Sequence, residues 1–157
     1  MVTYPVIPPL ASAERKKKVT TLILHATAGS SLAGALEALR ARKLSYHYII
    51  EKDGKVWKCC ASSRVAHHAG KSTGPDGPHC NAYSIGVCFV NRNTGTDPYT
   101  QAQHVAAVEL ARELKKAFPD LTWFSTHYWV SPGRKTDPKG YDVQAFAQET
   151  GLVKWKP

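Results

Sequence analysis

A short apolar run, residues 20–25 (TTLILH), constrains the fold of this chain most strongly. It is rich in β-branched and aliphatic residues, which is typical of a buried central strand, and it ends in His25. A turn follows, and residues 31–43 then repeat their apolar side chains at helical spacing, with Ser30 or Ser31 as the N-cap. A buried strand followed directly by an amphipathic helix predicts a layered α/β structure.

The rest of the chain continues this alternation. Residues 46–60 read as a hairpin turning at Asp53-Gly54, residues 83–91 as a second buried strand, and residues 121–126 as a short strand. A helix is expected from Thr100, which forms a capping-box pattern with Gln103, to about Phe118, and a last helix from about Asp142 to Gly151. On the long helix we expect a buried face of Ala106, Leu110, Leu114 and Ala117.

This order predicts one α/β domain with a central mixed β-sheet flanked by α-helices. We expect residues 1–18 to form an irregular N-terminal arm and residues 19–157 to form the catalytic domain. Residues 61–83 are predicted to be a long loop, which is unusual in a compact domain and often functional. With 157 residues, 43% of them hydrophobic, the chain is long enough for one real core.

Net charge and cysteine content indicate which partners the protein binds and which state its thiols adopt. The formal net charge is +9, which favours anionic partners such as envelope polymers. Nucleic acid is disfavoured, because no aromatic platforms accompany a basic stripe. The four cysteines show no C-x-x-C pair, so we expect free, mostly buried thiols. No apolar run has the ~20 residues that span a bilayer, and the N-terminus lacks a signal peptide; we expect a monomer made in the cytoplasm.

Residues 126–140 (THYWVSPGRKTDPKG) gather His127, Lys135 and Asp137 in a segment broken by prolines and glycines. His25 and His127 each stand at the end of a predicted strand, where ligands gather in α/β sheets. Two imidazoles and a carboxylate suit zinc, with a fourth position left to water. From spacing alone, a solvated surface loop remains an open alternative.

Five motifs occur in a familiar order: LILHATAG, SYHYIIEKDGKV, VAHHAG, HCNAYSIGVCFVN and THYWVSPGRKTDP. With them the chain resembles the zinc-dependent N-acetylmuramoyl-L-alanine amidases of the amidase-2 type, from about residue 20 to residue 145. This family includes phage lysins, recycling amidases and peptidoglycan recognition proteins. The resemblance implies an α/β amidase fold and a zinc cofactor.

The resemblance also assigns roles to residues. It implies that His25, His127 and Asp137 are zinc ligands and that Tyr46 and Lys135 are catalytic. It implies substrate-binding roles for His68, at the rim of the groove, and for Asn81. We add Trp129, in the metal-binding loop, as a wall for a sugar ring. One position departs from the recycling amidases, which carry a glutamate base where this chain has Cys88.

The resulting hypothesis is a zinc hydrolase that cleaves the amide bond between N-acetylmuramic acid and L-alanine in peptidoglycan. We expect a phage or prophage endolysin that reaches the host cell wall after release from the cytoplasm. Two alternatives stay open: a cytoplasmic recycling amidase for anhydro-muropeptides, and a non-catalytic peptidoglycan-binding protein. The complete His25, His127 and Asp137 set counts against the last, and Cys88 counts against the recycling enzyme.

Overall fold

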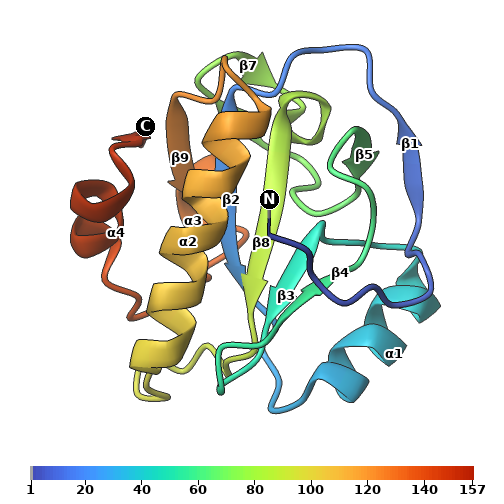
Figure 1. The fold of residues 1–157 in the computed structure, drawn as a ribbon, viewed down its shortest axis with the longest axis vertical. Helices are drawn as coiled ribbons and strands as arrows, with labels where there is room; N and C mark the ends of the chain where they lie inside the picture. The colour runs from blue at the N-terminus through green and yellow to red at the C-terminus, as the bar shows by residue number, and fades with distance from the viewer. Residues whose placement is uncertain (1) are drawn as a thin grey trace.

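The computed structural model describes residues 2–157, and a six-stranded mixed sheet forms its centre (Figure 1). Neighbouring strands run parallel except for the last pair, β3 and β4, which form the expected antiparallel hairpin. The predicted run 20–25 becomes β2, in the middle of the sheet. The strand order is β10 (Val153–Lys154), β9 (Trp123–Thr126), β2 (Thr21–Ala26), β8 (Ser84–Phe89), β3 (Tyr48–Ile50) and β4 (Val56–Lys58).

The helices begin where their capping residues predict. The Ser31 side chain accepts a hydrogen bond from the Gly34 amide at the start of α1, and Thr100 and Gln103 form the capping box of α2. One detail of the sequence prediction is wrong: Ala117, in the last turn of α2, is exposed. The residues buried from this helix are Gln103, Ala107, Val108, Leu110, Ala111 and Leu114. The helix bounds are α1 (Leu32–Arg42), α2 (Gln101–Ala117), α3 (His127–Val130) and α4 (Val143–Thr150).

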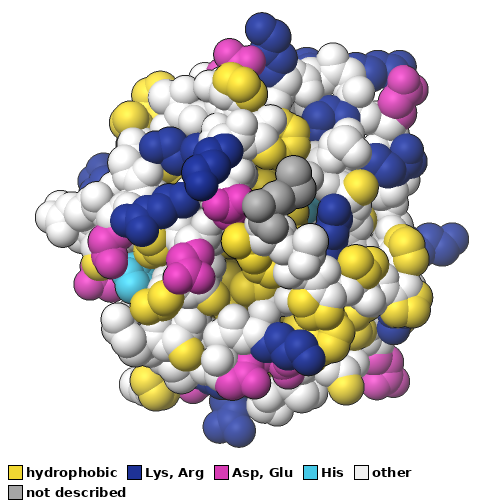
Figure 2. All heavy atoms as spheres, in the orientation of Figure 1, with side chains coloured by type: hydrophobic (Ala, Val, Ile, Leu, Met, Phe, Trp, Pro, Cys, Tyr) yellow, Lys and Arg dark blue, Asp and Glu magenta, His cyan; other side chains and the backbone are white. Residues whose placement is uncertain are grey.

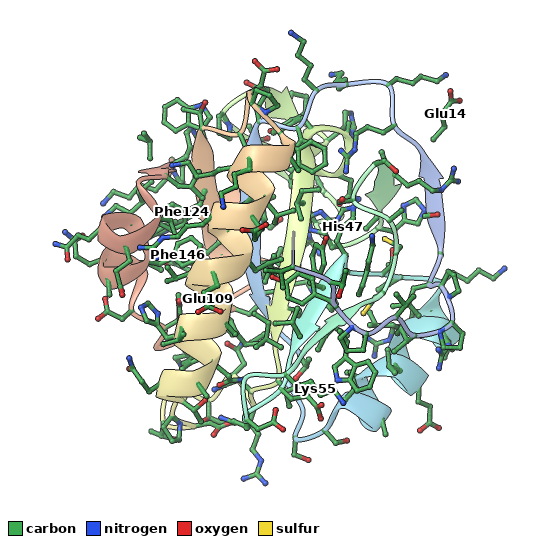
Figure 3. All side chains as sticks on the ribbon, in the orientation of Figure 1. Glu14, His47, Lys55, Glu109, Phe124 and Phe146 are labelled. Atoms are coloured by element: carbon green, nitrogen blue, oxygen red, sulfur yellow. The ribbon has the colours of Figure 1, made fainter. Side chains whose placement is uncertain are left out.

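The two faces of the sheet receive different side chains. Because successive residues of a strand point to opposite faces, Leu22 and Leu24 lie on one face of β2, and Ile23 and His25 lie on the other. The first face packs against α2 and α4, and we call it the helix-covered face (Figure 1). There the rings of Phe124 and Phe146 meet with centroids 5.0 Å apart (Figure 3).

The opposite face, which we call the site face, is covered by α1 and by the connection between β4 and β8. This connection was expected to be a loop, but it contains the short strands β5 (Arg64–Ala66), β6 (Thr73–Gly74) and β7 (Gly77–Pro78) and the 3-10 helix η1 (Cys80–Tyr83). Backbone pairing between neighbouring segments satisfies polar groups that a long irregular loop would leave unpaired.

The N-terminal segment is attached to this face. Strand β1 (Ser12–Glu14) pairs with β5, and Ile7 and Leu10 are buried beside α1. The guanidinium of Arg15 donates to four backbone carbonyls, those of Ser62, Arg64, Ala82 and Ser84. These contacts describe how residues 2–18 lie, whereas a boundary between an arm and a catalytic domain stays a prediction.

The four cysteines are free and buried, which confirms the expectation from their spacing. Among residues 2–157, none of the helices combines the length and the apolar character needed to cross a bilayer. On the face drawn in Figure 2, Lys and Arg side chains lie scattered among acidic and hydrophobic ones. This face therefore presents mixed charge.

Candidate metal centre

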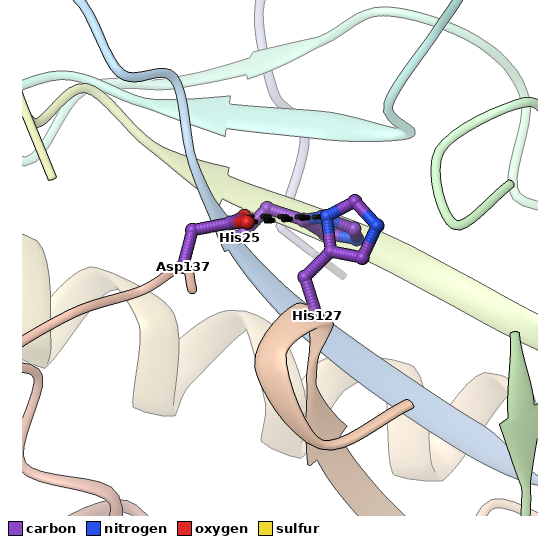
Figure 4. A group of neighbouring side chains, drawn as sticks. All are labelled: His25, His127 and Asp137. Carbon is purple, nitrogen blue, oxygen red and sulfur yellow. Dashed lines mark hydrogen bonds and ion pairs between the residues drawn. The ribbon is translucent and has the colours of Figure 1, made fainter. Parts of the chain in front are cut away.

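Strand β2, the start of α3 and the segment after α3 bring His25, His127 and Asp137 together at the carboxyl ends of β2 and β9 (Figure 4). Strands β2 and β9 are parallel neighbours with Leu24 opposite Thr126, so the residues that follow, His25 and His127, lie side by side at the same end of the two strands. The segment after α3 then returns to β2, where the Asp137 carboxylate accepts a hydrogen bond from the Ala26 amide at 3.1 Å. All three side chains are buried.

The candidate ligand atoms face one another at short range. His25 Nδ1 lies 3.0 Å from His127 Nδ1. The Asp137 carboxylate places Oδ2 3.5 Å from His25 Nδ1 and Oδ1 3.2 Å from His127 Nδ1. Candidate ligand atoms of all three residues lie within 4.8 Å of one another. One small cation can therefore be reached by all three residues.

The hydrogen bonds on the outer side of each ring decide which nitrogen carries the proton. His127 Nε2 lies 3.1 Å from the Ala69 carbonyl, which can only accept, and 3.5 Å from Arg134 Nη2, which can only donate. The shorter contact favours a proton on Nε2 and a bare Nδ1. His25 Nε2 lies 2.8 Å from His68 Nδ1. His68 Nε2 in turn lies 3.1 Å from the Ser84 hydroxyl, whose proton goes to the Cys80 carbonyl at 2.6 Å. His68 therefore donates through Nε2 and accepts at Nδ1, so His25 also has a bare Nδ1.

With these tautomers, two lone pairs and a carboxylate point at one another without a proton between them. Such a donor set fits a bound cation, because a cation turns this mutual repulsion into coordination. Two imidazole nitrogens and one carboxylate oxygen suit zinc. The Asp137 carboxylate also accepts the Ala26 amide, and a hydrogen bond to the charged form favours that form. The Asp137 side chain therefore offers an anionic oxygen donor.

His25 is also in the state that coordination requires. Burial, followed by the neighbouring His127, lowers the pKa of His25 to about 4, and the Lys135 ammonium contributes in the same direction. A neutral imidazole at pH 7 offers a lone pair to a metal without first losing a proton.

A cleft of about 390 Å³ opens over this cluster, and its lining is basic. Arg42 of α1 lines it together with Arg134 and Lys135 of the segment after α3, whereas Asp137 is the only acidic residue in the lining. Arg134 also donates to the carbonyls of Ala69 and Lys71. These hydrogen bonds connect the segment after α3 to residues 69–71. The cleft therefore favours anionic groups in whatever it binds.

Tyr46 and Cys88 lie beside His25. The Tyr46 ring centroid is 4.9 Å from that of His25, and Cys88 pairs with His25 across β2 and β8. Burial, with further contributions from Cys88 and Asp137, raises the pKa of Tyr46 well above its usual value. Burial also raises the pKa of the Cys88 thiol well above its usual value. Both groups stay protonated at neutral pH, so neither is a ready base.

The predicted substrate-binding residues lie in different places. His68 lines the cleft but is only 6% exposed, and both of its ring nitrogens are engaged inside the protein. Asn81 uses its side-chain oxygen to accept the backbone amides of His68 and Ala69. Trp129 lies on α3 in a second groove of about 420 Å³, next to the first cleft, and Thr136 lines both.

Sequence reasoning missed Arg42 and Arg134, which line the cleft. It also missed Ala69, whose carbonyl contacts His127 Nε2, and Ser84, whose hydroxyl contacts His68 Nε2. The two arginines sit among other surface charges in the sequence, so no local pattern separates them. The Ala69 contribution comes from its backbone carbonyl, which has no sequence signature at all.

Known proteins resemble this chain in sequence and in fold. The 1,6-anhydro-N-acetylmuramyl-L-alanine amidase AmpD of Escherichia coli (strain K12) is 34% identical over 97 residues, which are 61% of this chain and 52% of that protein. The chain thus spans about half the length of the curated relatives that it matches. The crystal structure of a selenomethionine AmpD derivative matches with a TM-score of 0.81 at 21% identity, covering 95% of both chains, and so shows a shared fold.

AmpDh3 from Pseudomonas aeruginosa, solved in complex with anhydromuramic pentapeptide, matches with a TM-score of 0.76 at 26% identity over 87% of this chain and 61% of that chain. The curated relatives agree with the anhydro-muropeptide alternative better than with the endolysin expected from the sequence. The family model described as N-acetylmuramoyl-L-alanine amidase matches residues 15–140, most of the described chain. The protein therefore belongs to the N-acetylmuramoyl-L-alanine amidase family, Amidase_2.

Proposed function

We propose that this protein is a zinc-dependent amidase that hydrolyses the bond between the lactyl group of N-acetylmuramic acid and L-alanine. The observation that carries the proposal is the meeting of His25 Nδ1, His127 Nδ1 and the Asp137 carboxylate beside a basic cleft, which His127 and Asp137 line. These three residues would hold the metal. When bound, zinc supplies a Lewis acid that activates water near neutral pH and polarises the scissile carbonyl.

Lys135 would stabilise the negative charge that develops on the carbonyl oxygen. Its side chain lines the cleft, and its ammonium is near enough to His25 to affect the pKa of that residue. A fixed cation in a partly dehydrated cleft lowers the barrier most where charge appears only in the transition state. This role needs no proton transfer to or from Lys135.

Tyr46 would act as a hydrogen-bond donor. Its raised pKa keeps the hydroxyl protonated, so it orients water or the substrate carbonyl more readily than it accepts a proton. Cys88 does not replace a glutamate base, because its buried thiol is neutral. The proton that the leaving amine needs then comes from the attacking water, because neither Tyr46 nor Cys88 is a base that could relay it.

The cleft charge supports a peptide substrate with free carboxylates. A muramoyl peptide carries at least its C-terminal carboxylate, and Arg42 and Arg134 both line the cleft. Arginine binds carboxylates in a bidentate geometry, which fixes orientation as well as affinity. We therefore assign the stem peptide to the basic cleft.

The preferred substrate of this proposal is a soluble anhydro-muropeptide, as the names of the curated relatives suggest. An amidase for polymeric wall, as an endolysin requires, is the second candidate. The adjoining groove, lined by Tyr128, Trp129, Pro138 and Tyr141, favours it, because aromatic faces suit sugar rings of a longer glycan strand. The two candidates also differ in location, since the first acts on a cytoplasmic fragment and the second on the wall.

Purified protein tests the proposal with two substrates, an anhydro-muropeptide and isolated peptidoglycan. We expect new L-alanine amino groups to appear, the reaction to stop with a chelator, and zinc to restore it; Asp137→Ala loses both zinc and activity. New reducing sugar ends would instead mean a glycosidase and overturn the bond assignment.

The Trp129→Ala variant separates the two candidates. If polymer is the substrate, this variant loses activity on peptidoglycan and keeps it on the soluble fragment. If the wild type cleaves the soluble fragment far faster and Trp129→Ala changes neither rate, the second groove has no role in substrate binding and the endolysin alternative falls.

A further inference from the structure

The residue His68 lies on the site face, in contact with the backbone of β8. A Cβ atom on Gly86 would stand 2.6 Å from Cγ and 2.7 Å from Nδ1 of the His68 ring, so the ring occupies the space that only a glycine leaves free. The ring spans from His25 on one strand to Ser84 on the next, at 2.8 and 3.1 Å. This packing holds the imidazole in one orientation.

The neighbouring residue, Ala69, serves the other histidine. Its carbonyl accepts the Nε2 proton of His127 at 3.1 Å. Thus two consecutive residues supply the outer hydrogen bonds of both candidate ligands, one through a side chain and the other through the backbone. Ligands that come from distant parts of the chain are oriented by one short segment.

Asn81 holds this segment in place. Its Oδ1 accepts the backbone amide of His68 at 3.1 Å and that of Ala69 at 2.8 Å. One amide oxygen that accepts two successive N–H groups fixes the position of the peptide between them. Asn81 does not line the cleft, so its side chain acts on the segment and not on a ligand in the cleft.

We propose that the His68-Ala69 segment, held by Asn81, positions both histidine ligands and fixes their tautomers with Nδ1 free for the metal. His68 accepts the hydrogen bond from His25 and in turn donates to Ser84. The Ala69 carbonyl accepts the hydrogen bond from His127. This inference rests on the proposed metal site and replaces a substrate-binding role for His68 and Asn81 with a positioning role. Outer partners of this kind typically contribute 10–100-fold to metal affinity.

The test measures zinc affinity by competition with a chromophoric chelator, together with the absorption spectrum of the cobalt-substituted protein. We expect His68→Phe, which has no acceptor, to bind zinc about 10–100-fold more weakly. His68→Gln, whose amide oxygen can accept from His25, is expected to recover part of the loss. Ser84→Ala and Asn81→Ala are expected to weaken binding about tenfold, and Asn81→Asp, which keeps an acceptor oxygen, to weaken it less.

Ser125→Ala is the matched control. Ser125, like Ser84, is a buried strand serine whose hydroxyl donates to a backbone carbonyl, that of Trp155 at 2.9 Å. We expect this variant to lose stability but to keep the zinc affinity and the cobalt spectrum of the wild type.

The outcomes separate the inference from the proposed function. If the wild-type protein binds no zinc, the proposed metal site fails. If the wild type binds zinc, and His68→Phe and Ser84→Ala bind it equally well or change only the KM, the positioning role is wrong and His68 acts only as a lining residue of the cleft. Should His68→Phe not fold, Ser84→Ala and nitrogen NMR of the metal-free wild type decide, because the proposal requires the Nε2–H tautomer in both His25 and His127.

Discussion

The two faces of the central sheet use burial for opposite purposes. On the helix-covered face, Leu24, Phe89 and Phe124 of the sheet are buried with residues of α2 and α4 such as Phe146, and they contribute apolar area. On the site face, β2 and β8 bury His25 and Ser84, and His68 packs between them. The first face stabilises the fold without directional requirements, whereas the second requires every buried polar atom to find a partner of the correct sign.

This difference predicts that stability and metal binding can be changed separately. A substitution on the helix-covered face removes apolar contacts and leaves the donor set unchanged. A substitution on the site face changes a tautomer or a ligand while most of the core stays packed. The following predictions test that separation in order of expected size.

Phe146→Ala gives the largest expected effect on stability. The side chain is fully buried in the helix-covered core, so we expect a loss of about 3–5 kcal/mol in the free energy of unfolding. Zinc affinity of the folded variant should stay at the wild-type value. Urea unfolding and zinc titration measure the two quantities, with Val105→Ala, at a 43% exposed position on α2, as the control. A large fall in zinc affinity would show that the two faces are coupled.

Lys135→Met removes one charge from the site face without removing a ligand. We expect the barrier for amide hydrolysis to rise by about 2.7–4 kcal/mol, a fall in kcat of about 10²–10³-fold, because the oxyanion loses its cation. Zinc binding and thermal stability should change little. Steady-state kinetics on the muropeptide provide the measurement, and Lys116→Met, on the exposed side of α2, is the control. Wild-type kcat in Lys135→Met would remove this lysine from the mechanism.

The pH dependence of stability should come mainly from the site face. Burial lowers the pKa of His47 to about 4, and this effect outweighs the hydrogen bond to the Arg64 carbonyl, which acts in the opposite direction. As the pH falls from about 6.5 towards 4, the unfolded chain takes up a proton at His47 before the folded protein does, so the folded state loses stability. Between pH 7 and pH 5 this amounts to roughly 2 kcal/mol from this residue.

Chelated protein unfolded with urea at both pH values provides the measurement. His47→Gln should lose that share of the pH dependence, whereas His79→Gln, at an exposed position, should keep the wild-type slope. His25 shifts in the same direction, with a pKa of about 4, so part of the slope remains in either variant. An identical slope in His47→Gln and the wild type would contradict the assignment.

Local signals in the sequence were sufficient for much of the architecture. The apolar run of β2, the capping box at Thr100 and the Asp53-Gly54 turn depend on neighbours within a few residues, so they could be predicted directly. The connection 61–83 and the pairing of β1 with β5 could not, because their partners lie far away in the chain. The exposure of Ala117 likewise depends on where α2 passes the edge of the core.

The sequence by itself determined the order of the elements and the residue types that can meet at the carboxyl ends of β2 and β9. Only the tertiary structure decided which nitrogen of each histidine is free, because the partners that settle it, His68 and the Ala69 carbonyl, are 43 and 58 positions away in the chain. Every residue has a backbone carbonyl, so the sequence does not show which carbonyl accepts a hydrogen bond from a histidine. The sequence also does not show which ring nitrogen of a histidine carries the proton. Such contacts become visible only when packing brings the segments together.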